Sequence, residues 1–278
     1  MEYTDKLLGA VQHNKTVLCV GLDPNPDLIP DSIKEDFPEA ERYVEQFCAE
    51  IIDATQDYCC AYKPNLAFFE ALGPGGLNVY ERVTRRIPGD KIIISDAKRG
   101  DIGSTAEQYK KAYFDRFDAD AVTLNPLMGF ETLDPFTGDS SRAIYSLVLT
   151  SNPGANDLLL RRFEGRGSLA EYIADQLRRK MELSKTHIGM VVGATYPADI
   201  KGVLSAYPTA SLLIPGIGSQ GGSTADLYSI LAGHQGIPVV SSSRSIIYAG
   251  SGKNWKKGVA ESAGKMNREL EKISRLYI

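Results

Sequence analysis

The sequence has no long hydrophobic run and very few histidines. No stretch reaches the roughly 18 consecutive apolar residues that a membrane-spanning helix needs. Residues 1–15 mix charged and apolar side chains and lack the apolar core of a signal peptide. We therefore expect a cytoplasmic protein that makes no contact with a membrane. The three histidines, His13, His187 and His234, are scattered along the chain, which argues against a histidine-based metal site.

Cysteines and net charge are scarce as well. The four cysteines show no C-x-x-C spacing, and most lie in apolar runs, which is typical of buried reduced thiols rather than metal ligands. The formal net charge is −4, and lysine and arginine do not gather into a basic arm, so we expect no nucleic-acid partner. The sequence contains no motif for a metal or an organic cofactor, and we expect neither.

Short apolar runs recur along the 278 residues and predict strands. They are rich in Val, Ile and Leu and are nearly continuous rather than alternating, as in parallel strands that are buried on both faces. The eight runs cover residues 16–22, 59–63, 91–96, 121–125, 144–150, 188–193, 211–214 and 238–242.

Segments with helical character separate these runs. They cover residues 38–56, 104–117, 168–183, 223–232 and 254–276. Regular alternation of strand and helix predicts a single (β/α)8 TIM barrel domain over residues 1–278, with residues 1–15 as an N-terminal helical extension. An open doubly wound sheet is the structural alternative. Two long connections, 23–37 and 151–167, are either lids or ordered surface loops.

Charged residues follow three successive strands of the expected barrel. Asp96 and Lys98 are two residues apart at the end of the third strand, so in an extended chain their side chains point to the same side. Lys63 ends the second strand and Asp23 the first, so Lys63 and Asp96 are placed to pair. Asp101 lies just past a glycine turn and can point elsewhere. The alternative is that these are ordinary polar residues at strand ends with no catalytic role.

An array of aspartates and lysines supports a particular kind of chemistry. Nearby carboxylates keep a buried lysine protonated, because opposite charge favours the ionised form. Such a lysine is a poor Schiff-base nucleophile, but it stabilises developing negative charge and donates a proton. The pattern therefore favours a reaction that forms a carbanion and then protonates it.

A glycine-rich segment after the seventh strand predicts a phosphate site. Residues 215–222 include Gly218 and Gly221, which allow backbone N–H groups to approach an anion, and Gln220, an amide donor. Arg244 follows the eighth strand and offers a planar guanidinium to phosphate oxygens. The loops after strands seven and eight are the usual phosphate site of this barrel. Tight turns alone are the alternative explanation for the glycines.

Together these residues resemble the orotidine 5′-phosphate decarboxylase family, in its longer bacterial subgroup. The resemblance extends from residue 21 to residue 244. Its motifs are Asp96-x-Lys98-x-x-Asp101-Ile102-x-x-Thr105, Lys63-Pro64-Asn65, Thr150-Ser151-Asn152-Pro153-Gly154 and the 215–222 loop. It implies an enzyme without a cofactor that converts orotidine 5′-phosphate to UMP, the last step of de novo pyrimidine biosynthesis.

The resemblance also implies a role for each matching residue. Lys98 protonates C6 of the pyrimidine as carbon dioxide leaves, and Asp96 lies against the departing carboxylate. Asp101 and Thr105 reach into the site of the neighbouring subunit of a homodimer. The remaining implied roles are ribose contacts for Lys63 and Asp23, pyrimidine recognition for Ser151, and phosphate binding for Gln220 and Arg244. Asn125, at the end of the fourth strand, is a candidate pocket residue with no assigned role.

Two other functions remain open on the sequence. A sugar-phosphate decarboxylase or hexulose-phosphate synthase of the same barrel superfamily has a similar Asp-x-Lys-x-x-Asp cluster, but these enzymes use a magnesium ion. A non-catalytic barrel that binds a phosphorylated metabolite needs the phosphate loops but not the paired lysines and aspartates.

Overall fold

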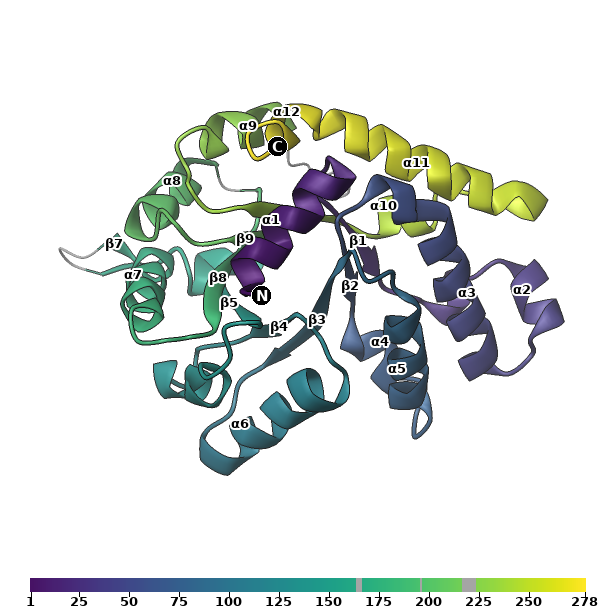
Figure 1. The fold of residues 1–278 in the computed structure, drawn as a ribbon, viewed down its shortest axis with the longest axis horizontal. Helices are drawn as coiled ribbons and strands as arrows, with labels where there is room; N and C mark the ends of the chain where they lie inside the picture. Colours follow the sequence, from purple (N-terminus) through teal and green to yellow (C-terminus); the bar gives the residue numbers. More distant parts are fainter. Residues whose placement is uncertain (164–166, 196, 217–223) are drawn as a thin grey trace.

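The chain folds into a closed barrel of eight parallel strands surrounded by helices (Figure 1). The structure is a computed structural model and describes residues 1–163, 167–195, 197–216 and 224–278. In chain order the barrel strands are β1 (Leu18–Leu22), β2 (Ala61–Pro64), β3 (Ile92–Arg99), β4 (Ala121–Leu124), β5 (Ala143–Leu149), β8 (His187–Val192), β9 (Leu212–Pro215) and β10 (Pro238–Ser242). This confirms the predicted TIM barrel and excludes the open sheet, because β1 pairs with both β2 and β10.

All eight predicted runs form barrel strands. Every residue of β1, β4 and β10 is buried, as expected for strands covered by the barrel core on one face and by helices on the other. The largest difference in bounds is at β3, which was expected to end at Asp96 and continues to Arg99.

Helices form the outer layer (Figure 1). They are α2 (Asp31–Asp36), α3 (Ala40–Thr55), α4 (Leu66–Glu70), α5 (Gly76–Arg86), α6 (Gly103–Lys110), α7 (Leu169–Met181), α8 (Pro197–Ala206), α9 (Thr224–Leu231), α10 (Arg244–Ile247), α11 (Trp255–Glu269) and α12 (Glu271–Ser274). The sequence pattern did not predict α2, α4, α5, α8 or α10, and α2 lies in the connection 23–37 that was expected to be a lid or a surface loop. The connection from β4 to β5 holds a 3₁₀ helix (Phe130–Phe136) with Pro135 inside it, where an ideal barrel has an α-helix.

The long connection between β5 and α7 has its own local structure. It contains a 3₁₀ helix (Pro153–Asp157) and two short antiparallel strands, β6 (Arg162–Phe163) and β7 (Gly167–Ser168). At its end, the hydroxyl of Ser168 accepts a hydrogen bond from the amide of Glu171, and the Glu171 carboxylate accepts one from the amide of Ser168. This is a capping box, and it fixes the start of α7 at the point where the sequence predicts that the helix begins.

The helix α1 (Tyr3–Asn14) lies across the end of the barrel where the strands begin (Figure 1). Tyr3 is fully buried, and its hydroxyl lies 2.9 Å from the hydroxyl of Tyr145 on β5. Its ring stacks on His187 at the start of β8, with 5.8 Å between ring centroids. This helix therefore closes the barrel at the end opposite to the charged residues.

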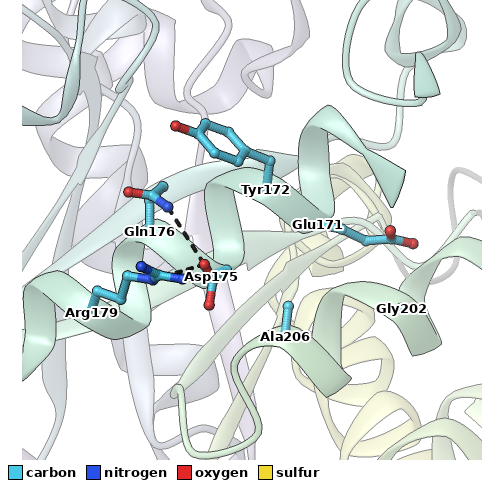
Figure 2. Close-up of a pocket in the computed structure, with 7 residues that line it drawn as sticks. All are labelled: Glu171, Tyr172, Asp175, Gln176, Arg179, Gly202 and Ala206. Carbon is cyan, nitrogen blue, oxygen red and sulfur yellow. Dashed lines mark hydrogen bonds and ion pairs between the residues drawn. The ribbon is translucent and has the colours of Figure 1, made fainter. Parts of the chain in front are cut away.

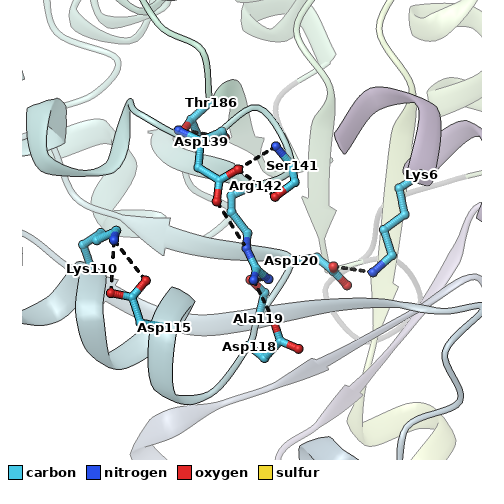
Figure 3. A network of polar contacts seen from close by, with 10 residues as sticks. All are labelled: Lys6, Lys110, Asp115, Asp118, Ala119, Asp120, Asp139, Ser141, Arg142 and Thr186. Carbon is cyan, nitrogen blue, oxygen red and sulfur yellow. Dashed lines mark hydrogen bonds and ion pairs between the residues drawn. The ribbon is translucent and has the colours of Figure 1, made fainter. Parts of the chain in front are cut away.

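A network of charged contacts connects several segments of the chain at this closed end of the barrel (Figure 3). Arg142, just before β5, donates hydrogen bonds to the carbonyl oxygen of Ala119 at 2.9 Å and to the carboxylate of Asp118 at 2.6 Å. Lys6 of α1 pairs with Asp120, which also accepts a hydrogen bond from the amide of Ile93. These contacts fix α1 and the segments leading into β3, β4 and β5, which leaves the other barrel end for ligands.

The partly buried His187 is expected to make folding stability depend on pH. Burial lowers its pKa to about 4, against about 6.5 in an unfolded chain. As the pH falls below 6.5 the unfolded chain takes up the proton first, so His187 contributes its full stability above pH 6.5 and loses it progressively toward pH 4.

Between pH 7 and 4.5 we expect the wild type to lose about 2 kcal/mol more unfolding free energy than His187→Gln. Glutamine can still accept the hydrogen bond that the Ser211 amide donates to His187 Nε2. Urea denaturation at both pH values measures the difference. His13→Gln is the control, because the His13 side chain is largely exposed. Equal pH slopes for the wild type and His187→Gln would contradict the prediction.

Candidate active site

Three of the sequence-predicted residues form a charged array at the carboxyl ends of β2 and β3. The Nζ atom of Lys63 lies 2.6 Å from Asp96 Oδ2, and the Nζ atom of Lys98 lies 2.5 Å from Asp96 Oδ1. The side chains of Lys63 and Asp96 are each only 8% exposed, whereas that of Lys98 is 50% exposed. Asp96 thus bridges a buried ammonium group and one that a ligand can reach.

The backbone conformation that positions Lys98 differs from the expected one. The registers Ser95↔Val122 and Arg99↔Leu124 show that β3 bulges against β4. Lys98 lies in this bulge with φ +48°, in the left-handed region. The expectation that Asp96 and Lys98 face the same side is correct, but the reason was wrong, because the chain is not extended there. A left-handed non-glycine residue is strained, and such strain concentrates at functional sites.

Burial and charge act against each other in the array. Burial disfavours the ionised form of Lys63, but the carboxylates of Asp96 and Asp23 outweigh it and hold the pKa of Lys63 above its usual range. Burial likewise disfavours the carboxylate of Asp96, yet Lys63 and Lys98 hold its pKa well below the usual range. Both groups are therefore ionised at neutral pH, as an electrostatic role requires.

The carboxylate of Asp23 has capacity to bind a further group. Its Oδ1 atom is buried and has no hydrogen-bond partner among the residues that the structure describes. Unsatisfied buried acceptors are uncommon in folded proteins, and a missing ligand is one explanation for them. A ligand hydroxyl is the kind of donor that this atom accepts.

Tyr248 links Asp23 to the predicted phosphate site, and the sequence analysis did not find it. Its hydroxyl donates to the carbonyl oxygen of Asp23 at 2.8 Å and accepts from the amide of Asn25 at 2.6 Å. Tyr248 follows directly after α10, the helix that begins at Arg244. No sequence signal reveals this contact, because it depends on β1 and β10 becoming neighbours when the barrel closes.

The residues around the predicted phosphate site are described only in part. Arg244 is exposed and makes no ion pair with any residue in the described part of the chain. Next to it, the Oγ atom of Ser243 is buried and has no partner within the same ranges. Gln220, Gly218 and Gly221 lie outside the described residues.

Two further predicted residues lie at the ends of neighbouring strands. The carbonyl oxygen of Ser151, after β5, accepts a hydrogen bond from the hydroxyl of Thr195 at 3.2 Å. A Cβ atom on Gly193 would lie 2.7 Å from the amide nitrogen of Ser151, so the chain leaving β8 packs directly against Ser151. The side-chain oxygen of Asn125, after β4, accepts from the amide of Leu127, which is a turn-forming contact.

Asp101 and Thr105 do not join the array of their own chain. The Asp101 carboxylate accepts a hydrogen bond from the amide of Ile102 at 2.8 Å, and Thr105 is exposed in the first turn of α6. The structure thus brings Lys63, Asp96 and Lys98 together and leaves Asp101 and Thr105 at the surface.

A surface hollow between α7 and α8 is not a competing site (Figure 2). None of the residues predicted from the sequence lines it, and it lies in the outer helical layer. Two of its charges neutralise each other, since Arg179 Nε donates to the Asp175 carboxylate at 2.9 Å, and Arg178 contacts the same carboxylate.

Neither a metal-binding cluster nor a membrane-spanning helix occurs within the described ranges. No group of three or more His, Cys, Asp and Glu side chains in that part of the chain is arranged to hold a metal ion. No helix there is both long and apolar enough to cross a membrane.

Comparison with known proteins identifies relatives over nearly the whole chain. Residues 16–257 match the family described as orotidine 5′-phosphate decarboxylase / HUMPS. An orotidine 5′-phosphate decarboxylase of Roseiflexus castenholzii is 41% identical over 276 residues, covering 99% of each chain, and one of Variovorax paradoxus is 42% identical, covering 98% of each. The solved structure of OMP decarboxylase from Leishmania donovani superposes with a TM-score of 0.81 at 30% identity, covering 99% of each chain.

Proposed function

The chain belongs to the orotidine 5′-phosphate decarboxylase / HUMPS family, and we propose that Lys63, Asp96 and Lys98 carry out its reaction by electrostatic catalysis without a cofactor. It decarboxylates orotidine 5′-phosphate to uridine 5′-phosphate, the last step of de novo pyrimidine biosynthesis. The observation that carries the mechanism is the Asp96 carboxylate held between two lysine ammonium groups at the barrel mouth.

In this mechanism the bond between C6 and the substrate carboxylate breaks, and its electron pair stays on C6. Asp96 lies against the departing carboxylate, and carbon dioxide leaves. The ammonium group of Lys98 stabilises the negative charge at C6 and transfers a proton to it. Lys63 is too buried to act as a donor in the same way, and it holds Asp96 ionised and in place.

The rest of the substrate binds to groups around the mouth. The free Oδ1 atom of Asp23 accepts a ribose hydroxyl, with Lys63 close to the same hydroxyls. Ser151 recognises the pyrimidine. Arg244 and Gln220 bind the phosphate, with backbone amides at Gly218 and Gly221. Phosphate binding is remote from C6, so its energy is available to close the site and remove water from the charges.

The proposal includes a homodimer of single-domain barrels with shared sites. Asp101 and Thr105 complete the site of the partner, because they lie at the surface next to their own array rather than in it. The segments after the adjacent strands β3 and β4 also carry exposed apolar side chains: Ile102 is 51%, Leu127 67% and Met128 57% exposed. A second copy of the chain would cover this apolar surface.

The four free thiols fit a reducing, cytoplasmic location.

A magnesium-dependent reaction on a sugar phosphate is the second candidate, because the matching family description includes HUMPS. The curated relatives at about 40% identity favour orotidine 5′-phosphate decarboxylation instead. A non-catalytic barrel would bind orotidine 5′-phosphate and never convert it.

We expect the purified protein to convert orotidine 5′-phosphate at the same rate with and without excess EDTA. The mechanism assigns every step to side chains of the protein, so a chelator removes nothing that it needs. The loss of substrate absorbance measures the rate, and a magnesium-dependent enzyme treated in the same way is the positive control. Activity that EDTA abolishes and magnesium restores would favour the second candidate. Binding without turnover would favour a non-catalytic barrel.

A further inference from the structure

The hydroxyl of Thr123 lies at the centre of the β3 bulge. Its Oγ1 atom accepts hydrogen bonds from the amide of Ala97 at 3.0 Å and from the amide of Lys98 at 2.9 Å. The same hydroxyl lies 3.0 Å from Asp96 Oδ1. Thr123 belongs to β4 and is almost fully buried, at 1% exposure. One side chain therefore contacts three consecutive residues of the charged segment.

The direction of these hydrogen bonds is fixed by chemistry. Both amides can only donate, so the Thr123 oxygen must accept from each of them. The single proton of the hydroxyl is then left for the Asp96 carboxylate, which can only accept while it is ionised. Asp96 Oδ1 consequently receives hydrogen bonds from Thr123 and Lys98, and Oδ2 receives one from Lys63.

The bulge depends on a side-chain acceptor at position 123. Between the register pairs Ser95↔Val122 and Arg99↔Leu124, β3 has more residues than β4, so the regular ladder cannot pair every amide. The Thr123 hydroxyl takes the place of a ladder carbonyl for two of them. It thereby stabilises Lys98 in its left-handed conformation, in which Nζ reaches Asp96.

We propose that Thr123 is a positioning residue for the decarboxylation, holding Asp96 ionised and correctly oriented and Lys98 at the reacting carbon. This inference rests on the proposed function of the array. Thr123 does not touch the substrate in this proposal, because its side chain is buried on β4 and its hydroxyl is occupied by Asp96 and two backbone amides. Its loss therefore affects the chemical step more than substrate binding.

The test compares Thr123→Val, which replaces the hydroxyl with a methyl group of similar size, with Thr123→Ser, which keeps the hydroxyl. We expect the valine variant to lose about 100-fold in kcat with a KM for orotidine 5′-phosphate within about threefold of wild type. The serine variant is expected to stay within about tenfold of wild-type kcat. Circular dichroism and UMP binding by calorimetry establish that each variant is folded.

Thr84→Val is the matched control. Thr84 is also a buried threonine, but its hydroxyl donates to the carbonyl oxygen of Glu81 within α5, away from the array. Its kcat is expected to equal that of the wild type. Thr123→Val with the kcat of Thr84→Val would overturn the positioning role, as would a serine variant that is as slow as the valine variant.

The outcomes also separate this inference from the proposed function. A wild-type protein that does not convert orotidine 5′-phosphate overturns both. An active wild type with an equally active Thr123→Val overturns only the positioning role. Where the valine variant fails to fold, the serine variant decides, because it loses only a methyl group: a folded serine variant that loses more than about tenfold in kcat contradicts a role for the hydroxyl.

Discussion

Lys98→Ala is expected to lower the kcat for orotidine 5′-phosphate by about 10⁴-fold or more, while UMP still binds. In the proposed mechanism the variant removes both the proton donor and the positive charge that faces the carbanion. The phosphate and ribose contacts proposed for UMP come from other loops and are retained. The loss of substrate absorbance measures kcat, and calorimetry measures UMP binding.

Lys256→Ala is the matched control for this variant. The Lys256 side chain is 54% exposed, close to the 50% of Lys98, and it likewise pairs with a carboxylate, that of Glu50, at 2.6 Å. It lies on α11 in the outer layer, so its kcat should equal that of the wild type. A Lys98→Ala variant that retains more than a few per cent of wild-type kcat would refute the proton-donor role.

Mixing two inactive variants is expected to restore activity if the dimer shares its sites. Lys98→Ala and Asp101→Ala each inactivate both sites of a homodimer. In a hybrid dimer one site carries both substitutions and the other carries neither. Random exchange of subunits at equal concentration should therefore restore about a quarter of wild-type activity, which the same absorbance assay measures.

Hybrid formation needs an independent measurement, and native mass spectrometry of differently tagged subunits provides it. Mixing Lys98→Ala with Asp96→Ala is the control, because both residues belong to the same chain's array, so each site of the hybrid lacks one of them and stays inactive. A second control is Lys98→Ala mixed with Lys98→Met, which leaves Lys98 in neither site. Hybrids that form without recovering activity in the Lys98 and Asp101 pair would exclude a shared site.

The strands of this protein could be predicted because their buried environment requires a recognisable run of apolar residues in the sequence. Strands covered on both faces need apolar side chains at nearly every position, and all eight runs of that kind became barrel strands. The capping box at Ser168 and Glu171 was predictable for a similar reason, since both partners are close in the chain. The helix α5 was missed although Val79, Tyr80 and Val83 are buried, because short connections with many charged residues resemble loops.

The sequence predicted which residues form the candidate site, but not the contacts that position them. Lys63, Asp96 and Lys98 were found because they follow apolar runs, and strand ends in a parallel barrel share one face. No sequence pattern predicts the contacts of Thr123 and Tyr248. Each bonds to a segment far away in the sequence, through a hydroxyl that is common in many other environments.

The sequence by itself determined the barrel, its strand order along the chain and the identity of the charged residues at its mouth, because burial and strand polarity act locally on each segment. Only the tertiary structure decided that β3 bulges at Lys98, that Thr123 satisfies the freed amides, and that Tyr248 fastens the chain at Asp23 to α10. These features depend on which strands become neighbours when the barrel closes and on where their hydrogen-bond registers shift, and neither is encoded within a single segment.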